Sequence, residues 1–284
     1  MTLLQAILLG IVQGLTEFIP ISSTAHLVLA SRAMNLSLTP EQLTAAIAVI
    51  QLGTLVAVVL YFARDIWQIA YAFVRDHLAL VSKKTTGSRL SHEAWLGWLI
   101  IIGSLPVGIV GLLFKKQIEG TFTKNLWVIA TMMVVIAVLL AVAEFVGKKR
   151  RGMNELGLLD SIAVGFAQCL ALIPGSSRSG STIMAGLFAG ETRETAARFS
   201  FLLSMPAIAA SGLLELKEAL HKLPHDIFLT LIFGTVISGI VGYLSIWFLL
   251  RYLRTHTTGV FIGYRLLVGG AILLMLMMGK LAAL

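Results

Sequence analysis

The chain has 284 residues, of which 57% are hydrophobic and only 13% are charged, and its mean hydropathy is +0.90. A soluble globular protein needs more polar surface than this composition supplies, so a soluble protein is excluded. Apolar runs of about 20 residues, long enough to cross a bilayer as helices, recur along the chain, and strand-like alternation is absent. The sequence therefore predicts an all-α polytopic membrane protein with a single membrane domain, residues 1–284.

The first apolar segment, Leu3 to Ala30, is interrupted by the polar stretch QGLTEFIPISSTAH, which runs from Gln13 to His26. A secretory signal has a basic start and a purely apolar core, whereas this segment carries Glu17, Pro20 and His26. We therefore expect it to belong to the mature structure. A break lined by polar groups suits a re-entrant helical hairpin surrounded by protein better than a lipid-facing helix.

Further along the chain, six stretches are predicted to be transmembrane helices, and a second interrupted segment, Leu158 to Gly190, is predicted to be another re-entrant hairpin. The six predicted crossings are approximately Ala45–Phe62, Trp95–Phe114, Leu126–Val146, Phe199–Leu216, Ile227–Leu250 and Val260–Gly279.

The two interruptions resemble each other. GIVQGLTEFIPISSTAH from Gly10 and GFAQCLALIPGSSRSG from Gly165 share G-x-x-Q-x-L and then I-P-x-S-S, with one residue deleted in the second. Each copy precedes three predicted crossings, an odd number, so the copies would have opposite orientations. The interpretation is an inverted-topology repeat, approximately 1–150 and 155–284, which would place both breaks at mid-membrane, where such folds bind their ligands. A chance resemblance between two apolar segments is the alternative.

Positive charge is distributed unequally. If neither hairpin crosses, one side receives 13 of the 22 Lys and Arg residues and the other side receives 7. The positive-inside rule makes the first side cytoplasmic, which places both termini in the periplasm and favours a site that opens to the periplasm. The net charge of +8 then reflects loops near anionic lipid, and KKRRG from Lys148 is a membrane anchor, with no nucleic-acid partner implied. Arg178 and Arg265 lie within the membrane region, where topology does not explain them.

The first break combines two kinds of polar group. Gln13 and Glu17 are four residues apart, so they share a helix face and present oxygen ligands of the kind that Mg²⁺ and Ca²⁺ prefer. After Pro20, Ser23 and His26 share a face, and a hydroxyl beside an imidazole is a nucleophile beside a general base. The alternatives are hydroxyls that join helices and a satisfied interior histidine. Ionisable groups at membrane depth are costly, which favours a functional site.

The second break, IPGSSRSGST, has the small residues of a phosphate cradle that leads into a helix N-terminus. Arg178 would supply a bidentate cation, and Thr182, one turn further on, and Ser177 would donate to phosphate oxygens. Gly/Ser-rich breaks also merely bend helices. Because G-x-x-x-x-G-K-S/T is absent, the cradle is not a nucleotide P-loop. Arg265, near the start of the last crossing, either extends to the cytoplasmic interface or makes a second phosphate contact.

The motifs QGLTEF and PGSSRSGST together closely resemble those of the bacterial undecaprenyl-diphosphate phosphatase family, which is associated with bacitracin resistance. Gln13 and Glu17 match its E/Q-x-x-x-E pattern, the intervening Ser23 and His26 also fit, and the length and order of spans match over nearly the whole chain. The P-G-x-S-R-S-x-x-T pattern is matched by Pro174, Gly175, Ser177, Arg178, Ser179 and Thr182.

The resemblance implies a hydrolase of the bacterial plasma membrane that removes the terminal phosphate of undecaprenyl diphosphate and recycles the lipid carrier for cell-wall synthesis. It also implies a divalent cation, Mg²⁺ or Ca²⁺, and assigns three sets of residues. These are Gln13 and Glu17 at the metal or catalytic site, Ser23 and His26 as nucleophile and acid/base, and Ser177, Arg178, Ser179, Thr182 and Arg265 at the diphosphate. Many members carry Glu at the position of Gln13. An amide can ligate a cation but not act as a base, so Glu17 must hold any general-base role in this pair.

Several alternatives stay open. Ser23 could attack phosphorus to form a phosphoserine, or water could attack directly with His26 as base. A secondary transporter or flippase of an anionic lipid would use the same paired broken segments without cleavage. A phosphatidic acid phosphatase-like enzyme is suggested only by the likeness of SSTAH to a P-S-G-H element. The sequence does not determine prenyl chain length, the choice of cation or oligomeric state, for which a homodimer is one alternative.

Overall fold

The computed structural model describes residues 1–36, 38–81, 90–114, 125–223 and 227–283, and these are helical apart from short connections. Among them, six helices are long and apolar enough to cross a membrane. They are α3 (Pro40–Tyr61), α5 (His92–Leu113), α7 (Leu126–Val146), α10 (Arg193–Lys222), α11 (Phe228–Leu253) and α12 (Gly259–Met277). The predicted all-α polytopic class is confirmed. In the described residues, the only bridge between extended segments pairs Arg151 with Glu191.

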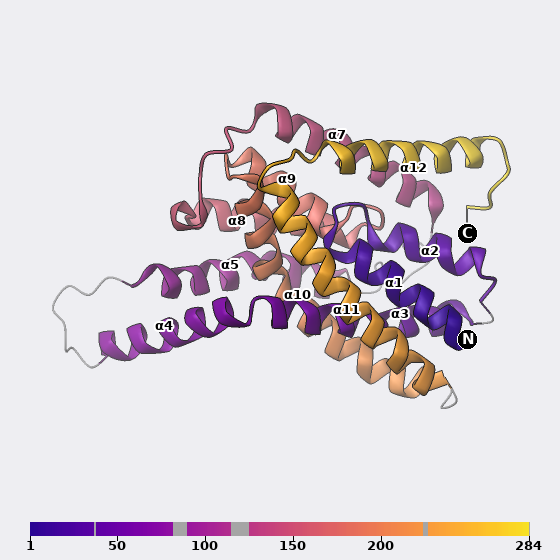
Figure 1. Cartoon of the computed structure of the whole chain (residues 1–284), viewed down its shortest axis with the longest axis horizontal. Helices are drawn as coiled ribbons and strands as arrows, with labels where there is room; N and C mark the ends of the chain where they lie inside the picture. Colours follow the sequence, from indigo (N-terminus) through magenta and orange to yellow (C-terminus); the bar gives the residue numbers. More distant parts are fainter. Residues whose placement is uncertain (37, 82–89, 115–124, 224–226, 284) are drawn as a thin grey trace.

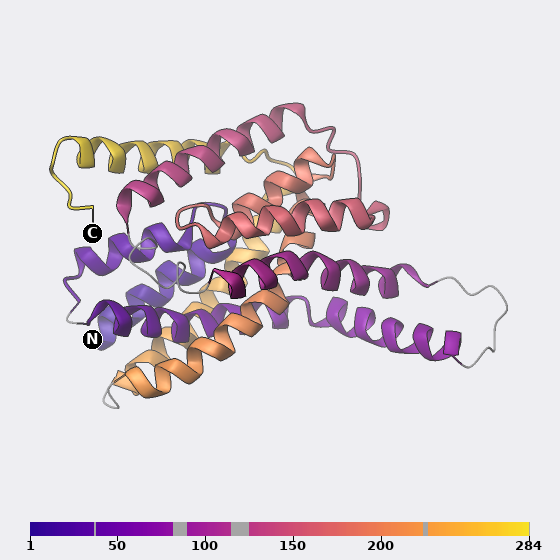
Figure 2. The same cartoon turned by 180° about the vertical axis from the view of Figure 1, so that it is seen from behind.

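Two helices differ from the predicted pattern. α10 has 30 residues and extends beyond the predicted crossing at both ends. α4 (Ala63–Val81) was not anticipated: it follows α3 after the single residue Phe62 and packs along α5. In Figures 1 and 2, α4 and α5 extend together away from the other helices, while the two chain ends lie at the opposite end of the molecule. Six of the cations used to assign the sides, Lys83, Lys84, Arg89, Lys115, Lys116 and Lys124, lie outside the described residues.

Both interrupted segments fold as helix, break and helix. The first consists of α1 (Leu3–Phe18) and α2 (Ser23–Ala33), and the second of α8 (Leu158–Cys169), the 3₁₀ turn η3 (Leu170–Leu172) and α9 (Arg178–Phe188). Pro20 and Pro174 lie in the breaks, where a residue without a backbone N–H ends the preceding helix. Whether the segments are re-entrant in a membrane stays a prediction.

Serine caps restart the helix in both breaks. Ser22, with φ of 81°, caps α2, and Ser177, with φ of 67°, caps α9. Ser22 lies nine residues after Gln13, and Ser177 lies nine residues after Gln168. The second break has one residue fewer between its glutamine and Pro174, but one residue more between Pro174 and its cap, so the two spacings are equal. Aligning I-P-x-S-S paired Ser22 with Ser176, whereas the caps pair Ser22 with Ser177. Left-handed φ values at non-glycine residues are strained, and such strain is concentrated at functional sites.

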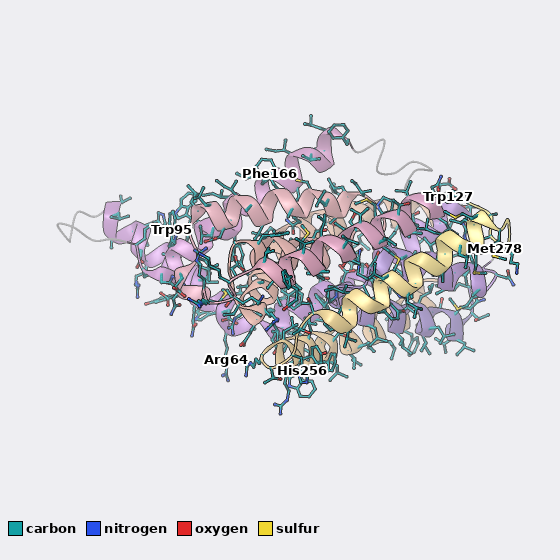
Figure 3. The ribbon with its side chains drawn as sticks, turned by 90° about the horizontal axis from the view of Figure 1, so that it is seen from above. Arg64, Trp95, Trp127, Phe166, His256 and Met278 are labelled. Carbon is teal, nitrogen blue, oxygen red and sulfur yellow. The ribbon has the colours of Figure 1, made fainter. Side chains whose placement is uncertain are left out.

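Glycines let each hairpin approach the opposite half of the chain. A Cβ on Gly10 would lie 2.3 Å from the carbonyl oxygen of Gly234 in α11, and a Cβ on Gly165 would lie 2.4 Å from that of Gly103 in α5. α1 therefore packs on α11 as α8 packs on α5. α7 and α12 pack against each other in opposite directions, since Trp127, at the start of α7, and Met278, just after α12, lie at the same end in Figure 3. These relations favour an inverted repeat, which stays a prediction.

Ion pairs join helix ends at the side assigned to the cytoplasm. They join the beginning of α10 to the beginning of α4, to the end of α7 and to Arg254 just after α11, and they join the beginning of α8 to Arg151 in the connection after α7. The pairs are Arg198–Asp65, Arg151–Asp160, Arg193–Glu144 and Arg254–Glu194.

Glu191 is a buried carboxyl group at this end of the molecule, in the turn between α9 and α10. It is 0% exposed, and neither side-chain oxygen has a hydrogen-bond partner among the described residues. Burial raises the pKa of Glu191 to about 7, with the negative charge of Asp160 acting in the same direction and Arg151 opposing it. The native protein therefore keeps this proton in a pH range where the unfolded chain, with a carboxyl pKa of 4.5, has lost it.

We expect the stabilising contribution of protonated Glu191 to fall as the pH rises from about 4.5 to about 7 and to be absent above pH 7. Glu191→Gln removes this titration, so it should raise the free energy of unfolding at pH 8 by about 3 kcal/mol relative to wild type, but not at pH 4.5. The measurement is the thermal midpoint in detergent across this pH range. Glu93→Gln, an exposed change at the start of α5, is the control. Parallel curves for wild type and Glu191→Gln would contradict the assignment.

Candidate active site

A charged contact joins the two breaks. The side chain of Gln13 donates from Nε2 to Oε2 of Glu17 at 3.0 Å, which confirms that these residues share a face of α1. Arg178, the first residue of α9, donates to Oε1 of the same carboxylate across 161 positions of sequence. Glu17 is only 8% exposed and the Arg178 side chain 17%, so the pair is largely buried. The first candidate carboxylate and the second candidate cation thus meet in one site.

Arg265 connects both breaks to α7. Its guanidinium is 0% exposed and donates only to backbone carbonyl oxygens among the described residues. The acceptors are Pro20 at 3.3 Å, Met132 at 3.3 Å, Met133 at 3.1 Å, Gly175 at 3.0 Å and Ser176 at 3.1 Å. The alternative in which Arg265 extends to the interface is wrong, because the side chain points into the protein. A direct phosphate contact stays a prediction. The geometry favours a structural role in which Arg265 binds the backbone of both breaks and holds them together, which we call the clamp.

Gly175 is required where the second break meets α7. Its φ is +92°, and a Cβ there would lie 2.1 Å from the carbonyl oxygen of Ile129. Only glycine adopts this conformation in such close contact with another backbone. The Pro174–Gly175 dipeptide of the motif therefore lets the second break pack directly against α7. Arg265 binds the backbone of the break at the same place.

The His26 ring is held at both nitrogens. Nδ1 lies 2.7 Å from the carbonyl oxygen of Ser22, and Nε2 lies 2.7 Å from the hydroxyl of Tyr264 in α12. The rings of His26 and Tyr264 are stacked, with centroids 5.6 Å apart and planes 14° from parallel. No hydrogen bond joins Ser23 to His26 in the described residues, so the predicted pairing of nucleophile and base is not formed in this structure.

The three candidate hydroxyl groups of the second break, those of Ser177, Ser179 and Thr182, are also engaged within the protein. Thr182 donates to the carbonyl oxygen of Arg178 at 2.7 Å and lies 2.5 Å from the hydroxyl of Ser200 in α10. Ser177 accepts from the backbone N–H of Gly180 and lies 3.2 Å from the hydroxyl of Ser179. Arg178 and Ser177 are partly exposed, whereas Thr182 and Ser179 are buried. Phosphate contacts by the three hydroxyl groups stay predictions.

The sequence analysis missed Tyr264 and Ser200. Tyr264 directly precedes Arg265 in FIGYRLL, but a tyrosine in an apolar crossing is usually a packing or interfacial residue. Ser200 is one of several serines in α10 and has no local motif. Only the packing of α12 against the first break and of α10 against α9 identifies these two residues.

The residues of the first break fit a hard cation. Gln13 and Glu17 offer an amide and a carboxylate group on one helix face, which is the donor chemistry of Mg²⁺ and Ca²⁺. The described residues contain no group of three or more His, Cys, Asp or Glu side chains that could hold a metal ion alone. A cation held by Gln13 and Glu17 would therefore need further ligands from outside these two side chains.

Comparisons with known proteins identify the family of the whole chain. The family model for the bacitracin resistance protein BacA matches residues 6–271. The chain is 53% identical over 277 residues to the undecaprenyl-diphosphatase of Syntrophobacter fumaroxidans, covering 97% of this chain and 98% of the relative. It is 48% identical to the undecaprenyl-diphosphatase of Chloroherpeton thalassium and 45% identical to that of Mycolicibacterium gilvum, with 100% of both chains covered in each case. The chain that brings Glu17, Arg178 and Arg265 together therefore belongs to the BacA bacitracin resistance protein family.

Proposed function

We infer that this chain is an integral membrane undecaprenyl-diphosphatase, which hydrolyses undecaprenyl diphosphate to undecaprenyl phosphate and inorganic phosphate. The lipid product is the carrier that cell-wall synthesis reuses. The observation that carries this inference is the contact between Glu17 and Arg178, which unites the two broken segments at one buried charged site. Similarity over the full length to proteins named undecaprenyl-diphosphatase supports it.

In the proposed mechanism, the diphosphate enters between the two breaks while the prenyl chain lies among the helices. Phosphoryl transfer depends mainly on positioning and on compensating the charge of the equatorial oxygens. Arg178 binds the terminal phosphate with its guanidinium, and the N-terminus of α9, capped by Ser177, faces the same anion. Arg265 holds both breaks at a constant separation through its carbonyl contacts.

We further propose that Gln13 and Glu17 hold a divalent cation that neutralises phosphate charge when it is bound. Ser23 and His26 remain the candidates for nucleophile and general base. Because the two side chains are not hydrogen-bonded to each other here, direct attack by water needs less rearrangement than attack by Ser23. Trapping of a phosphoserine at position 23 would reverse this preference.

The test is phosphate release by purified protein in detergent from a polyprenyl diphosphate, with and without Mg²⁺ and EDTA. We expect release that EDTA abolishes and either Mg²⁺ or Ca²⁺ restores. Release that is insensitive to EDTA would remove the cation from the proposal and favour a phosphatidic acid phosphatase-like reaction. If folded protein releases no phosphate, a transporter or flippase, which would use the same paired broken helices, becomes the better interpretation.

We also propose that the protein resides in the bacterial plasma membrane with both termini and the opening of the site on the periplasmic side. The excess of Lys and Arg residues on the opposite side supports this orientation. A cysteine introduced at Thr2, in a Cys169→Ser background, should react with an impermeant maleimide in intact spheroplasts. Reaction only after lysis would reverse the topology. A homodimer is a further proposal, to be checked by light scattering in detergent.

A further inference from the structure

The contacts of His26 define which nitrogen is available to act as a base. A backbone carbonyl only accepts hydrogen bonds, so Nδ1, at 2.7 Å from the oxygen of Ser22, must carry the proton of the neutral ring. Nε2 then holds the lone pair, and the Tyr264 hydroxyl at 2.7 Å donates to it. The basic nitrogen of the candidate general base is therefore directed at Tyr264.

The backbone that carries Tyr264 is fixed by the contacts of its neighbour in α12. The next residue, Arg265, is buried and bound to both breaks, so this part of α12 is held against the breaks. Tyr264 is 41% exposed, and the only hydrogen-bond partner of its hydroxyl among the described residues is His26. A hydroxyl both donates and accepts, so it can stay bonded to Nε2 whether or not that nitrogen is protonated.

We propose that the hydroxyl of Tyr264 is a further catalytic group of this site, through which Nε2 of His26 exchanges its proton during hydrolysis. The inference rests on the proposed function. The oxygen of the attacking water or serine hydroxyl forms a bond to the terminal phosphorus, and the bridging P–O bond breaks with its electron pair on the lipid phosphate. The proton of the attacking group passes to the Tyr264 oxygen as the Tyr264 proton passes to Nε2. The tyrosine is unchanged, and His26 becomes an imidazolium.

The first experiment compares Tyr264→Phe with Tyr243→Phe, which removes a hydroxyl from a similarly exposed tyrosine in α11 whose ring is tilted by 60° against that of Tyr61. Because general acid–base catalysis contributes about 10²- to 10⁴-fold, we expect Tyr264→Phe to lower kcat about 100-fold. KM should stay within about twofold, since the diphosphate contacts are elsewhere, and Tyr243→Phe should leave both constants unchanged. Incorporation of fluorotyrosine at position 264, which acidifies the phenol, should shift the pH profile of kcat. A purely structural role would not produce that shift.

A second measurement does not depend on turnover. Diethylpyrocarbonate modifies the unprotonated imidazole nitrogen, which Tyr264 occupies in wild type. We expect Tyr264→Phe to increase the rate of modification of His26 several-fold, measured by mass spectrometry against the exposed His256 in the same sample. Equal rates of His26 modification in wild type and Tyr264→Phe, or a kcat for Tyr264→Phe within twofold of wild type, would overturn the proposed proton relay through Tyr264. Either result would leave the proposed function intact. Absence of phosphate release by wild type would instead overturn the proposed function, and the relay with it.

Discussion

Replacing Arg178 with alanine should lower kcat/KM for a polyprenyl diphosphate by about 10³-fold, because the guanidinium is the charged donor expected to stabilise the transferred phosphoryl group. Arg178→Lys should recover only part of this loss, since an ammonium group keeps the charge but not the two parallel donors. Removing the partner with Glu17→Gln should cause a comparable loss, because Glu17 orients Arg178 and is also the candidate cation ligand.

The control for this prediction is Arg198→Lys. Arg198 is also paired with a carboxylate, Asp65 at 2.5 Å, and its guanidinium lies over the ring of Phe62, but it belongs to the ion pairs at the end that we assign to the cytoplasm. Its substitution should leave kcat/KM within about threefold of wild type, because surface ion pairs contribute little. Steady-state phosphate release on samples with matched circular dichroism spectra decides the matter. Arg178→Ala with more than a tenth of wild-type kcat/KM would show that the contact between the breaks is structural only.

Arg265→Met should lower the thermal midpoint in detergent by roughly 10 °C. The substitution removes the donors to five backbone carbonyl oxygens, three of them in the two breaks. A buried carbonyl oxygen left without its donor costs about 1 to 3 kcal/mol, and each kcal/mol shifts the midpoint of a protein of this size by roughly 2 to 4 °C. Arg265→Lys should be intermediate, since an ammonium group reaches fewer of these acceptors.

The same variant separates the clamp from a direct phosphate contact. If Arg265 serves mainly to bind diphosphate, Arg265→Met should raise KM with little change in thermal midpoint. Arg251→Met is the matched control, because Arg251 is exposed at the end of α11 and contacts only the Trp247 ring in the described residues. Its thermal midpoint should stay within about 2 °C of wild type. A stable Arg265→Met with raised KM would contradict the clamp.

The breaks could be predicted from the sequence because their causes are local. A proline ends the preceding helix, serine caps the following one, and residues four apart share a helix face, so the contact between Gln13 and Glu17 follows from spacing alone. The sequence comparison matched the wrong serine of the second break to Ser22, because it too used only local identity. Alignment by identity paired Ser22 with Ser176, whereas the helix start depends on the backbone conformation of the whole break.

Contacts over long sequence distances could not be predicted in this way. Tyr264 is 238 positions from His26, and whether the histidine contacts Ser23 or Tyr264 depends on how closely α12 approaches α2. The destination of Arg265 was equally open, because a lone arginine near a helix end is compatible with the interface, a ligand or a buried set of carbonyl groups.

The sequence by itself determined the membrane class, the six crossings, the two polar breaks and the family motifs, because hydropathy, proline placement and residue spacing act within one or two turns of chain. Only the tertiary structure decided that Glu17 meets Arg178, that Arg265 clamps both breaks and that His26 faces Tyr264. Those contacts join helices from opposite halves of the chain, and they form only where close glycine packing brings the two halves together.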